Sequence, residues 1–292
     1  MSFTILAINP GSTSTKCAIY CDTKEVWKKG VNHSSEDLSR HRTIMDQLEL
    51  RSAAVREGIR EAGIPLADIS AIVGRGGLLK PLEGGVYEVN ARMKADLASC
   101  KYGIHASNLG ALIADSLASE IGVPAYIADP VVVDELDPLA RYSGIPEIPR
   151  RSIFHALNQK ATARKAARSI GKAYAECTMI VAHMGGGTSI GMHVNGRVVD
   201  VNNALDGDGP FSIERAGTVP AGDWMRWILS HQHDPQALQL MLTGKGGLVA
   251  YLGTNEFMLI EKSAAGGGEL DAPLCEELIR ALCYQIAKSI AA

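Results

Sequence analysis

The sequence predicts an α/β protein built from two similar domains with mixed sheets and a cleft between them. Its 292 residues are 46% hydrophobic, which is enough to bury the cores of two domains. A glycine turn between two apolar strands occurs twice, about half a chain apart, as expected for an internal duplication. We therefore predict one domain over residues 1–150 and a second over residues 151–292.

The later glycine turn lies within residues 179–192, which read MIVAHMGGGTSIGM. Three consecutive glycines allow backbone N–H groups to surround an anion, because no Cβ atom obstructs the approach. Hydroxyl groups of Thr188 and Ser189 follow directly and add donors. A hairpin with a flexible turn is the plain alternative.

The earlier turn lies within residues 5–16, which read ILAINPGSTSTK and align with the later stretch without a gap. The alignment pairs Asn9 with His183, Gly11 with Gly185, Ser14 with Thr188 and Thr15 with Ser189. Two such hairpins that face each other would suit a nucleotide held between two domains.

Composition excludes several other functions. The net charge of -3 does not indicate a nucleic-acid-binding surface. The apolar runs are too short to span a membrane, and no basic leader precedes the first strand, so we expect a cytoplasmic protein. The six cysteines lack the two-residue spacing of zinc or redox motifs, so we expect reduced structural thiols.

Hydrophobic periodicity predicts the remaining elements. Strands are predicted at 4–9, 16–21, 25–29, 69–73, 124–129 and 196–201, with a hairpin at 80–89. Helices are predicted at 34–63, 91–99, 105–121, 156–170, 223–231, 235–242 and 271–292. Residues 131–149 and 202–217 are predicted to be irregular, and 243–247 to form a glycine turn.

Charged side chains follow two of the predicted strands. Arg75 lies among glycines after strand 69–73, where the missing side chains would let a substrate approach; a solvated loop arginine is the alternative. Asp129 follows strand 124–129, a position typical of metal-side or phosphate-side carboxylates, or of a turn cap. His155 begins a helix, and it either donates to an anion or packs as a core histidine.

These segments together resemble the acetate and short-chain fatty acid kinases, and within them the butyrate kinase branch. The resemblance rests on residues 9–16, 73–77, 129–136, 154–160, 183–187 and 200–217, in that order along the chain. It implies an actin-like (ribonuclease H-like) two-domain fold. It also implies a reversible reaction of ATP and Mg²⁺ with a short carboxylate, which gives ADP and an acyl phosphate and makes ATP during fermentation.

The residues suit that chemistry. A carboxylate is already an anionic nucleophile, so the reaction needs position and positive charge rather than a general base. By the resemblance, Arg75 and Arg215 are the active-site arginines, His155 donates to the transferred phosphoryl group, and Asp129 lies beside magnesium. Asn9 is counted with these catalytic residues. Phosphate-binding roles go to Asn9, Ser12, Ser14 and Lys16 in the first turn, to His183, Gly185, Gly186, Gly187, Thr188 and Ser189 in the second, and to Gly244 and Gly246. His105 lies near another family histidine, but its surroundings match poorly.

Other hypotheses stay open. The acid could be acetate, and the chain could be an ATP-gated binding module or an inactive remnant. The family pattern continues beyond the last helix with a strand, a Gly-Gly turn and a magnesium-side carboxylate. We therefore expect a truncated or naturally shortened member that binds ATP weakly and has little kinase activity as it stands. The apolar stripe of helix 271–292 is expected to pack on the sheet of the second domain. We also expect a homo-oligomer, because the missing strand would leave a sheet edge unpaired and apolar surface uncovered.

Overall fold

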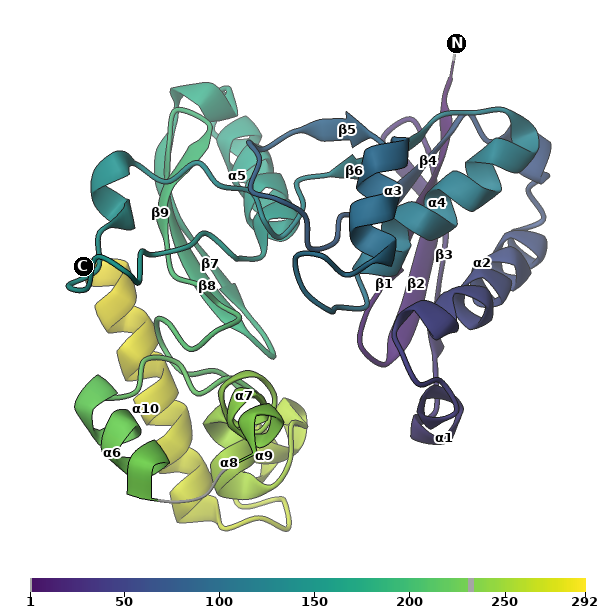
Figure 1. Cartoon of the computed structure of the whole chain (residues 1–292). Coiled ribbons are helices and arrows are strands. Elements are labelled where there is room, and N and C mark those ends of the chain that lie inside the picture. The colour runs from purple at the N-terminus through teal and green to yellow at the C-terminus, as the bar shows by residue number, and fades with distance from the viewer. Residues whose placement is uncertain (1, 231–233) are drawn as a thin grey trace. The chain divides into compact units, whose positions relative to one another are not determined.

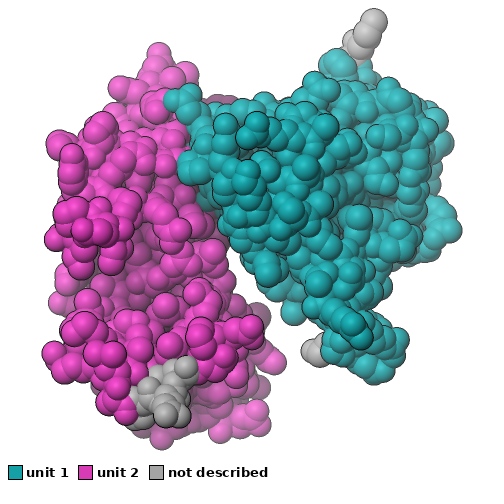
Figure 2. Space-filling model, in the orientation of Figure 1, with its two compact units in different colours: residues 1–133 teal, residues 134–292 magenta. Residues whose placement is uncertain are grey.

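The computed structural model describes residues 2–230 and 234–292. The chain forms two compact units, residues 1–133 and residues 134–292, which Figure 2 shows in different colours. Each unit contains its own sheet and its own hydrophobic core.

The first unit is built on a six-stranded mixed sheet (Figure 1). Its strands are β1 (Thr4–Pro10), β2 (Ser14–Cys21), β3 (Lys24–Asn32), β4 (Ala71–Arg75), β5 (Val86–Glu88) and β6 (Ala125–Ala128). The order is β3-β2-β1-β4-β6-β5; β1, β4 and β6 run parallel to one another, and the other pairs are antiparallel. The parallel strands therefore share one carboxyl-terminal edge.

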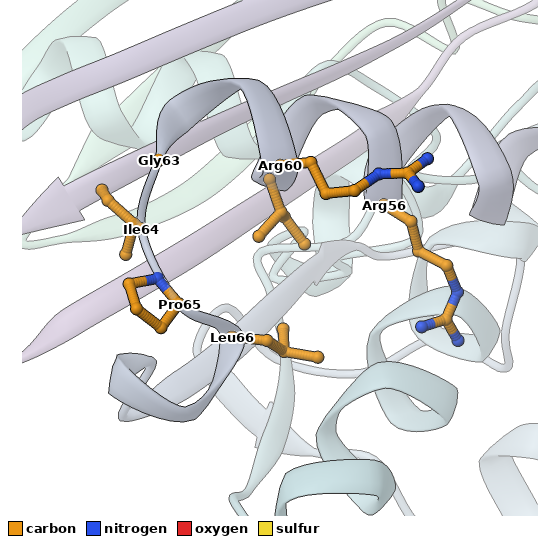
Figure 3. Close-up of a pocket in the computed structure, with 7 residues that line it drawn as sticks. Arg56, Arg60, Gly63, Ile64, Pro65 and Leu66 are labelled. Carbon is orange, nitrogen blue, oxygen red and sulfur yellow. The ribbon is translucent and has the colours of Figure 1, made fainter.

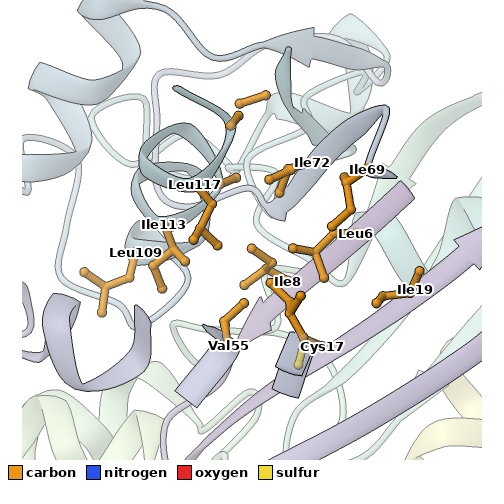
Figure 4. Packing of buried hydrophobic residues seen from close by; sticks show 14 residues of the cluster. Leu6, Ile8, Cys17, Ile19, Val55, Ile69, Ile72, Leu109, Ile113 and Leu117 are labelled. Atoms are coloured by element: carbon orange, nitrogen blue, oxygen red, sulfur yellow. The ribbon is translucent and has the colours of Figure 1, made fainter. Parts of the chain in front are cut away.

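The core of the first unit lies between this sheet and its helices (Figure 4). The helices are α1 (Ser35–Ser39), α2 (Leu48–Ala62), α3 (Ala91–Ala98) and α4 (Asn108–Ile121). Alternate residues of β1, Leu6 and Ile8, are buried, as the period of two in a strand requires. They pack against Val55 of α2 and a stripe on α4 that includes Leu109 and Ile113. The side chains of Ala7 and Asn9, which alternate with them in β1, therefore point to the opposite face of the sheet.

In residues 134–230 and 234–292, the second unit contains the antiparallel sheet β7-β8-β9 and the α-helices α5 to α10. The strands are β7 (Thr178–Met184), β8 (Thr188–Val194) and β9 (Arg197–Val201). The helices are α5 (Ala156–Ser169), α6 (Ala221–Ser230), α7 (Pro235–Thr243), α8 (Gly247–Leu252), α9 (Phe257–Ala264) and α10 (Ala272–Ala291). The stripe predicted on the last helix packs in the core of this unit, where Leu278 and Leu282 lie with Ile190 of β8 and Ile260 of α9.

The duplicated glycine hairpin is confirmed, because β1-β2-β3 and β7-β8-β9 are both antiparallel meanders. The gapless alignment is wrong by one residue. Pro10 pairs with Thr15 across a turn of residues 11–14, whereas Met184 pairs with Thr188 across residues 185–187. In the structure the partner of Asn9 is Lys16, and the partner of His183 is Ser189.

Two other predictions are wrong. The single helix at 34–63 is split, because α1 ends at Ser39 and Thr43 and Asp46 exchange backbone-to-side-chain bonds that begin a new helix. The hairpin at 80–89 does not form, because β5 pairs with β6. Helices α8 and α9 were not predicted, and residue 231 of the predicted helix 223–231 lies outside the described residues.

The six cysteines are all free thiols, as predicted. Burial raises the pKa of Cys17 to about 11, so its thiol stays protonated at neutral pH. Across residues 2–230 and 234–292, none of the helices combines the length and apolar character that a membrane crossing needs.

Candidate functional site

In the first unit, three of the predicted site residues form a row across neighbouring strands. Asn9 on β1 pairs with Lys16 on β2, and β1 runs parallel to β4 in the register Ile8 to Gly74. This register places Arg75 beside Asn9, and Nη1 of Arg75 donates to Oδ1 of Asn9 at 3.4 Å. The row lies at the carboxyl-terminal edge of the parallel strands, where α/β sheets commonly bind ligands.

Asp129 extends the same edge. Arg75 pairs with Ala128 at the end of β6, so Asp129 is the next residue beyond that pair. Its side chain is buried, and its backbone N–H donates to the carbonyl of Gly85 at 2.8 Å. Its φ of 35° lies in the left-handed region, which aspartate tolerates better than most side chains. The structure therefore brings a carboxylate to the edge that carries Arg75.

The glycines around Arg75 have a packing role that the sequence analysis did not predict. A Cβ atom on Gly74 would lie 2.2 Å from the carbonyl oxygen of Gly110 in α4. One on Gly77 would lie 2.5 Å from Oδ1 of Asn108, which accepts a bond from the N–H of Leu78. These glycines let α4 approach β4 closely. Burial lowers the pKa of Arg75 itself.

The first glycine turn is supported from behind by Arg51, a residue that the sequence analysis missed. This arginine of α2 is fully buried. Its guanidinium donates to the carbonyl oxygens of Ser12 and Ser14 at 3.1 and 3.0 Å, and to Oγ1 of Thr15 at 3.2 Å. Oε1 of Gln47 accepts from Nε at 3.1 Å and from Nη2 at 2.9 Å.

Every partner of Arg51 is neutral. Its five hydrogen bonds match the five N–H groups of a guanidinium, and no carboxylate in residues 2–230 or 234–292 pairs with it. Burial lowers its pKa, but arginine stays protonated in proteins. A positive charge without a counter-ion therefore lies directly behind the turn that was predicted to bind phosphate.

His33 completes the support of this turn. Its Nε2 lies 2.8 Å from Oγ1 of Thr15. Burial lowers the pKa of His33, and the charge of Arg51 lowers it further. Because Thr15 Oγ1 accepts from Arg51, its hydroxyl proton is available to donate to a neutral His33.

His105 lies three residues before α4. The hydroxyl of Ser107 is 2.7 Å from its Nδ1, and the N–H of Ser107 donates to the same nitrogen at 3.1 Å. Nδ1 of His105 is therefore an acceptor. No described contact joins it to Arg75, so its loose assignment stays a prediction.

In the second unit, two predicted histidines stack beside the glycine turn. The rings of His155 and His183 lie 3.7 Å apart between centroids and are tilted by only 10°. A Cβ atom on Gly187 would lie 3.3 Å from Cε1 of His155, and one on Gly185 would lie 3.5 Å from Nε2 of His183. Positive charges on both rings would repel each other at this distance.

The loop that carries Arg215 is joined to the same turn. The carbonyl of Gly186 accepts from Oγ of Ser212 at 2.6 Å and from the N–H of Glu214 at 3.0 Å. The N–H of Arg215 then donates to Oγ of Ser212 at 3.1 Å. The second turn and the Arg215 loop therefore form one hydrogen-bonded unit.

Arg215 itself is partly covered. Its Nη1 donates to the carbonyl of Thr243 and lies 3.5 Å from Oε2 of Glu214. Its buried Nε has no partner among the described residues. Burial lowers the pKa of Arg215, and the carboxylate of Glu214 opposes that shift. One of its N–H groups thus lacks a hydrogen-bond acceptor.

Glu214 is a second residue that the sequence analysis missed. Its Oε2 would lie 3.3 Å from a Cβ atom on Gly186, and its Oε1 accepts from Nδ2 of Asn255 at 2.9 Å. The sequence feature that could have identified Glu214 is its position directly before Arg215. A carboxylate therefore lies beside the glycine turn of the second unit.

The predicted nucleotide-binding glycines 244 and 246 follow α7. Gly246 has a packing reason, because its Cβ atom would lie 2.6 Å from the backbone nitrogen of Ala216. It also lines a pocket of about 460 Å³, together with Phe211, Trp224 and Tyr251. The pocket is partly aromatic, and Phe211 and Ala216 connect it to the loop that contacts Gly186.

A pocket of about 540 Å³ in the first unit contains none of the predicted site residues of that unit in its lining (Figure 3). It is lined by the end of α2 and the following residues 63–66, just before β4 begins. Arg75 is at the other end of β4. The two arginines of this pocket are paired with acids, Arg56 with Glu120 and Arg60 with Glu57.

Comparison with known proteins agrees with the fold and the motifs. No family model matches the chain. The chain is 50% identical over 291 residues to a probable butyrate kinase of Clostridium botulinum (strain Alaska E43), covering 99% of this chain and 81% of that protein. It is 49% identical over 288 residues to butyrate kinase 1 of Clostridium acetobutylicum, covering 99% of this chain and 80% of that protein.

A solved structure gives the same fold. The acetate kinase of Porphyromonas gingivalis matches with a TM-score of 0.74 at 16% identity, over 99% of this chain and 79% of that chain. The fold is therefore the acetate kinase type of the actin-like ATPase fold, as predicted. From the sequence relatives, the chain belongs to the butyrate kinase family. This confirms the predicted class, a phosphotransferase of the carboxylate kinase type.

Proposed function

We propose that this protein transfers the γ-phosphoryl group of ATP to butyrate, or to a close branched relative, and that the reaction also runs in reverse. The observation that carries the proposal is the identity of about half the residues, across 99% of the chain, to proteins named butyrate kinase. The row of Lys16, Asn9 and Arg75 at one sheet edge supports it, since phosphoryl transfer depends on positioned positive charge.

In this proposal the arginines supply the charge. Arg75 and Arg215 both remain cationic although burial lowers their pKa values. Each would neutralise the negative charge that spreads over the equatorial oxygens of the phosphoryl group in flight. The acceptor carboxylate attacks as the anion, so the protein removes no proton from it.

The two glycine turns would bind phosphate oxygens. The turn of residues 11–14, with Ser12, Ser14 and Lys16, carries the charge of Arg51 behind it. The turn of residues 185–187, with Thr188, would present backbone N–H groups, and His155 would donate from its imidazole. The pocket lined by Gly246 would take the nucleoside, since aromatic walls stack with a base.

The residues present also fit magnesium. Among the described residues there is no group of three or more His, Cys, Asp or Glu that could hold a metal alone. Mg²⁺ commonly binds one or two carboxylates and takes its other ligands from phosphates and water, so a buried carboxylate such as that of Asp129 fits its needs. Asp129 would hold the ion or its water shell, and the bound ion would neutralise phosphate charge.

Acetate is the second candidate acceptor. The structural match to an acetate kinase shows only the fold at 16% identity, so it does not favour acetate. Each additional buried methylene contributes about 0.8 kcal/mol, so a pocket shaped for butyrate should favour it over acetate by about tenfold or more.

The test is a hydroxamate assay. The protein is incubated with ATP, Mg²⁺, hydroxylamine and either butyrate or acetate, and both hydroxamate and free phosphate are measured. We expect hydroxamate, with the higher kcat/KM for butyrate. Phosphate without hydroxamate would indicate an ATPase, neither product would indicate a binding module or an inactive remnant, and equal efficiencies would overturn the choice of acid. The expected homo-oligomer stays a prediction for sedimentation measurements.

A further inference from the structure

A chain of hydrogen bonds crosses the buried side of β8 and ends at His155. The hydroxyl of Tyr174 lies 2.7 Å from Nδ1 of His193, and Nε2 of His193 lies 2.9 Å from Oε1 of Gln159. Nε2 of Gln159 lies 2.9 Å from the carbonyl and 2.8 Å from Oγ of Ser189. Oγ of Ser189 lies 2.9 Å from Nδ1 of His155.

The direction of this chain is fixed at Gln159, which is fully buried on α5. A backbone carbonyl can only accept, so the amide nitrogen of Gln159 must face the carbonyl of Ser189. The amide oxygen then faces His193 and requires a proton on Nε2 of that ring. The orientation follows from the partners alone.

The protonation state of His193 agrees with this requirement. It is fully buried, and burial, reinforced by the positive charge of Lys160, lowers its pKa to about 4. The ring is therefore neutral at physiological pH, with its single proton on Nε2. Its bare Nδ1 then accepts from the hydroxyl of Tyr174.

The hydrogen-bond partners also determine the direction in which the hydroxyl of Ser189 donates, since its side chain is completely buried. Its Oγ accepts from Gln159, and its other side-chain contact is Nδ1 of His155. If that nitrogen also donated, the serine proton would be buried without an acceptor, which costs about 1–3 kcal/mol. The hydroxyl therefore donates to Nδ1, and the proton of a neutral His155 lies on Nε2.

The backbone accommodates this network. Gly191 lies inside β8, where glycine normally weakens a strand. A Cβ atom there would lie 2.4 Å from Oε1 of Gln159 and 3.3 Å from Nε2 of His193. The glycine thus leaves room for the bond between these two side chains.

We propose that Gln159 and His193 are positioning residues, which orient the Ser189 hydroxyl so that His155 is held as the Nε2–H tautomer. Nε2 of His155 lies on the side of the glycine turn, since a Cβ atom on Gly187 would lie 3.6 Å from it. The ring therefore presents an N–H donor there. The use of this donor on a phosphoryl oxygen rests on the proposed function, but the tautomer itself does not.

The tautomer is measured in the ligand-free protein. Long-range ¹H–¹⁵N correlation spectra of protein labelled with ¹⁵N-histidine distinguish a proton on Nδ1 from one on Nε2. The chain has eight histidines, few enough to assign His155 from the signal that disappears in His155→Gln. We expect His155 as Nε2–H in the wild type and as a mixture of tautomers in Gln159→Met. A wild-type proton on Nδ1, or an unchanged tautomer in the variant, would overturn the proposal.

Kinetics then separate positioning from a structural role. We expect Gln159→Met to lower kcat by about 10²-fold, as for loss of an oriented donor, with little change in KM for ATP. Tyr174→Phe should have a smaller effect in the same direction. An unchanged kcat with a disturbed tautomer would show that the network serves only the fold, against the proposal.

The control changes a neighbouring buried pair. Nζ of Lys160, the next residue on α5, lies 2.8 Å from both carboxylate oxygens of Glu135. The double variant Lys160→Met with Glu135→Gln should lose stability but keep the His155 tautomer and kcat. If Gln159→Met does not fold, Ser189→Ala removes only the linking hydroxyl, and His155 should again be a mixture of tautomers. Because the spectra need no substrate, absence of butyrate kinase activity would contradict the proposed function and leave the tautomer test intact.

Discussion

Behind the turn between β1 and β2 lies a buried guanidinium, whereas behind the turn between β7 and β8 lies a series of neutral side chains. Arg51 donates to the carbonyls of Ser12 and Ser14 and has no acidic partner among the described residues. Gln159 instead donates to the carbonyl and hydroxyl of Ser189. The two hairpins share a backbone pattern but not the chemistry beneath it.

The difference indicates two ways to prepare a turn for an anion. A fixed buried charge favours any anion at the turn and is itself stabilised when one binds. A neutral network adds no net charge, but it can determine which atom of a neighbouring side chain carries a proton. The two hairpins therefore have the same backbone pattern, while the helices behind them, α2 and α5, place different residues against the turns.

The largest effect should come from the arginines at the two sites, because neither turn can replace their charge. We expect Arg75→Ala and Arg215→Ala each to lower kcat by about 10³-fold, with a much smaller change in ATP affinity. Lysine at either position should recover only part of the loss, since it lacks the planar fork of arginine. Equal losses in ATP binding and in turnover would instead assign these residues to ground-state binding.

The next largest effect should come from removing Arg51, the buried charge behind the first turn. Arg51→Met would leave the partly buried carbonyls of Ser12 and Ser14 without these donors, and we expect the free energy of unfolding to fall by about 3 kcal/mol. It should also reduce the rise in Tm that ATP produces, because the charge behind the turn is gone. Urea and thermal denaturation measure both quantities.

The same helix provides a matched control. Arg60 is also on α2, but it is exposed and pairs with Glu57. Arg60→Met should change stability by no more than about 1 kcal/mol and leave the ATP-dependent rise in Tm intact. If Arg51→Met kept that rise as well, the buried charge would support the fold without contributing to anion binding.

The sequence allowed the hairpins and the strand-end positions of Arg75 and Asp129 to be predicted, because both depend on local patterns. The row of Lys16, Asn9 and Arg75 depends on strand order and register, which the sequence did not reveal. The charged support could not be predicted, since Arg51, Arg56 and Arg60 all lie on one helix and only packing decides which is buried. Gln159 could not be predicted for the same reason, because it lies on a helix rich in lysine and arginine and only packing shows that it is buried. The one-residue difference between the turns depends on strand register, which the shared glycine at positions 11 and 185 does not reveal.

A third prediction concerns a feature that the two turns share, a buried histidine held neutral. Burial lowers the pKa of His33, and it lowers that of His193 to about 4. An unfolded histidine titrates near pH 6.5, so the unfolded chain binds more protons below that pH. Stability should therefore be complete above about pH 6.5 and decrease toward pH 4, by up to about 3 kcal/mol for His193.

Single substitutions can separate these contributions. His193→Gln and His33→Gln each remove a titrating ring, so each should reduce the pH dependence of the unfolding free energy, His193→Gln more strongly. Lys160 and Glu135 also act on His193 and remain in both variants. A wild-type pH dependence in His193→Gln would show that other groups cause the acid sensitivity.

The smallest effect should distinguish the carboxylates beside the two sites. Asp129→Asn keeps the shape of the side chain but removes its charge, so we expect the Mg²⁺ concentration for half-maximal activity to rise by about tenfold, with rescue by excess metal. Glu214 lies beside Gly186 and can keep its bond from Asn255 as a glutamine. Glu214→Gln should therefore leave the magnesium curve unchanged. If the two variants behaved in the opposite way, the metal would belong with the second turn, and the short left-handed bend at Asp129 would be only a feature of the fold.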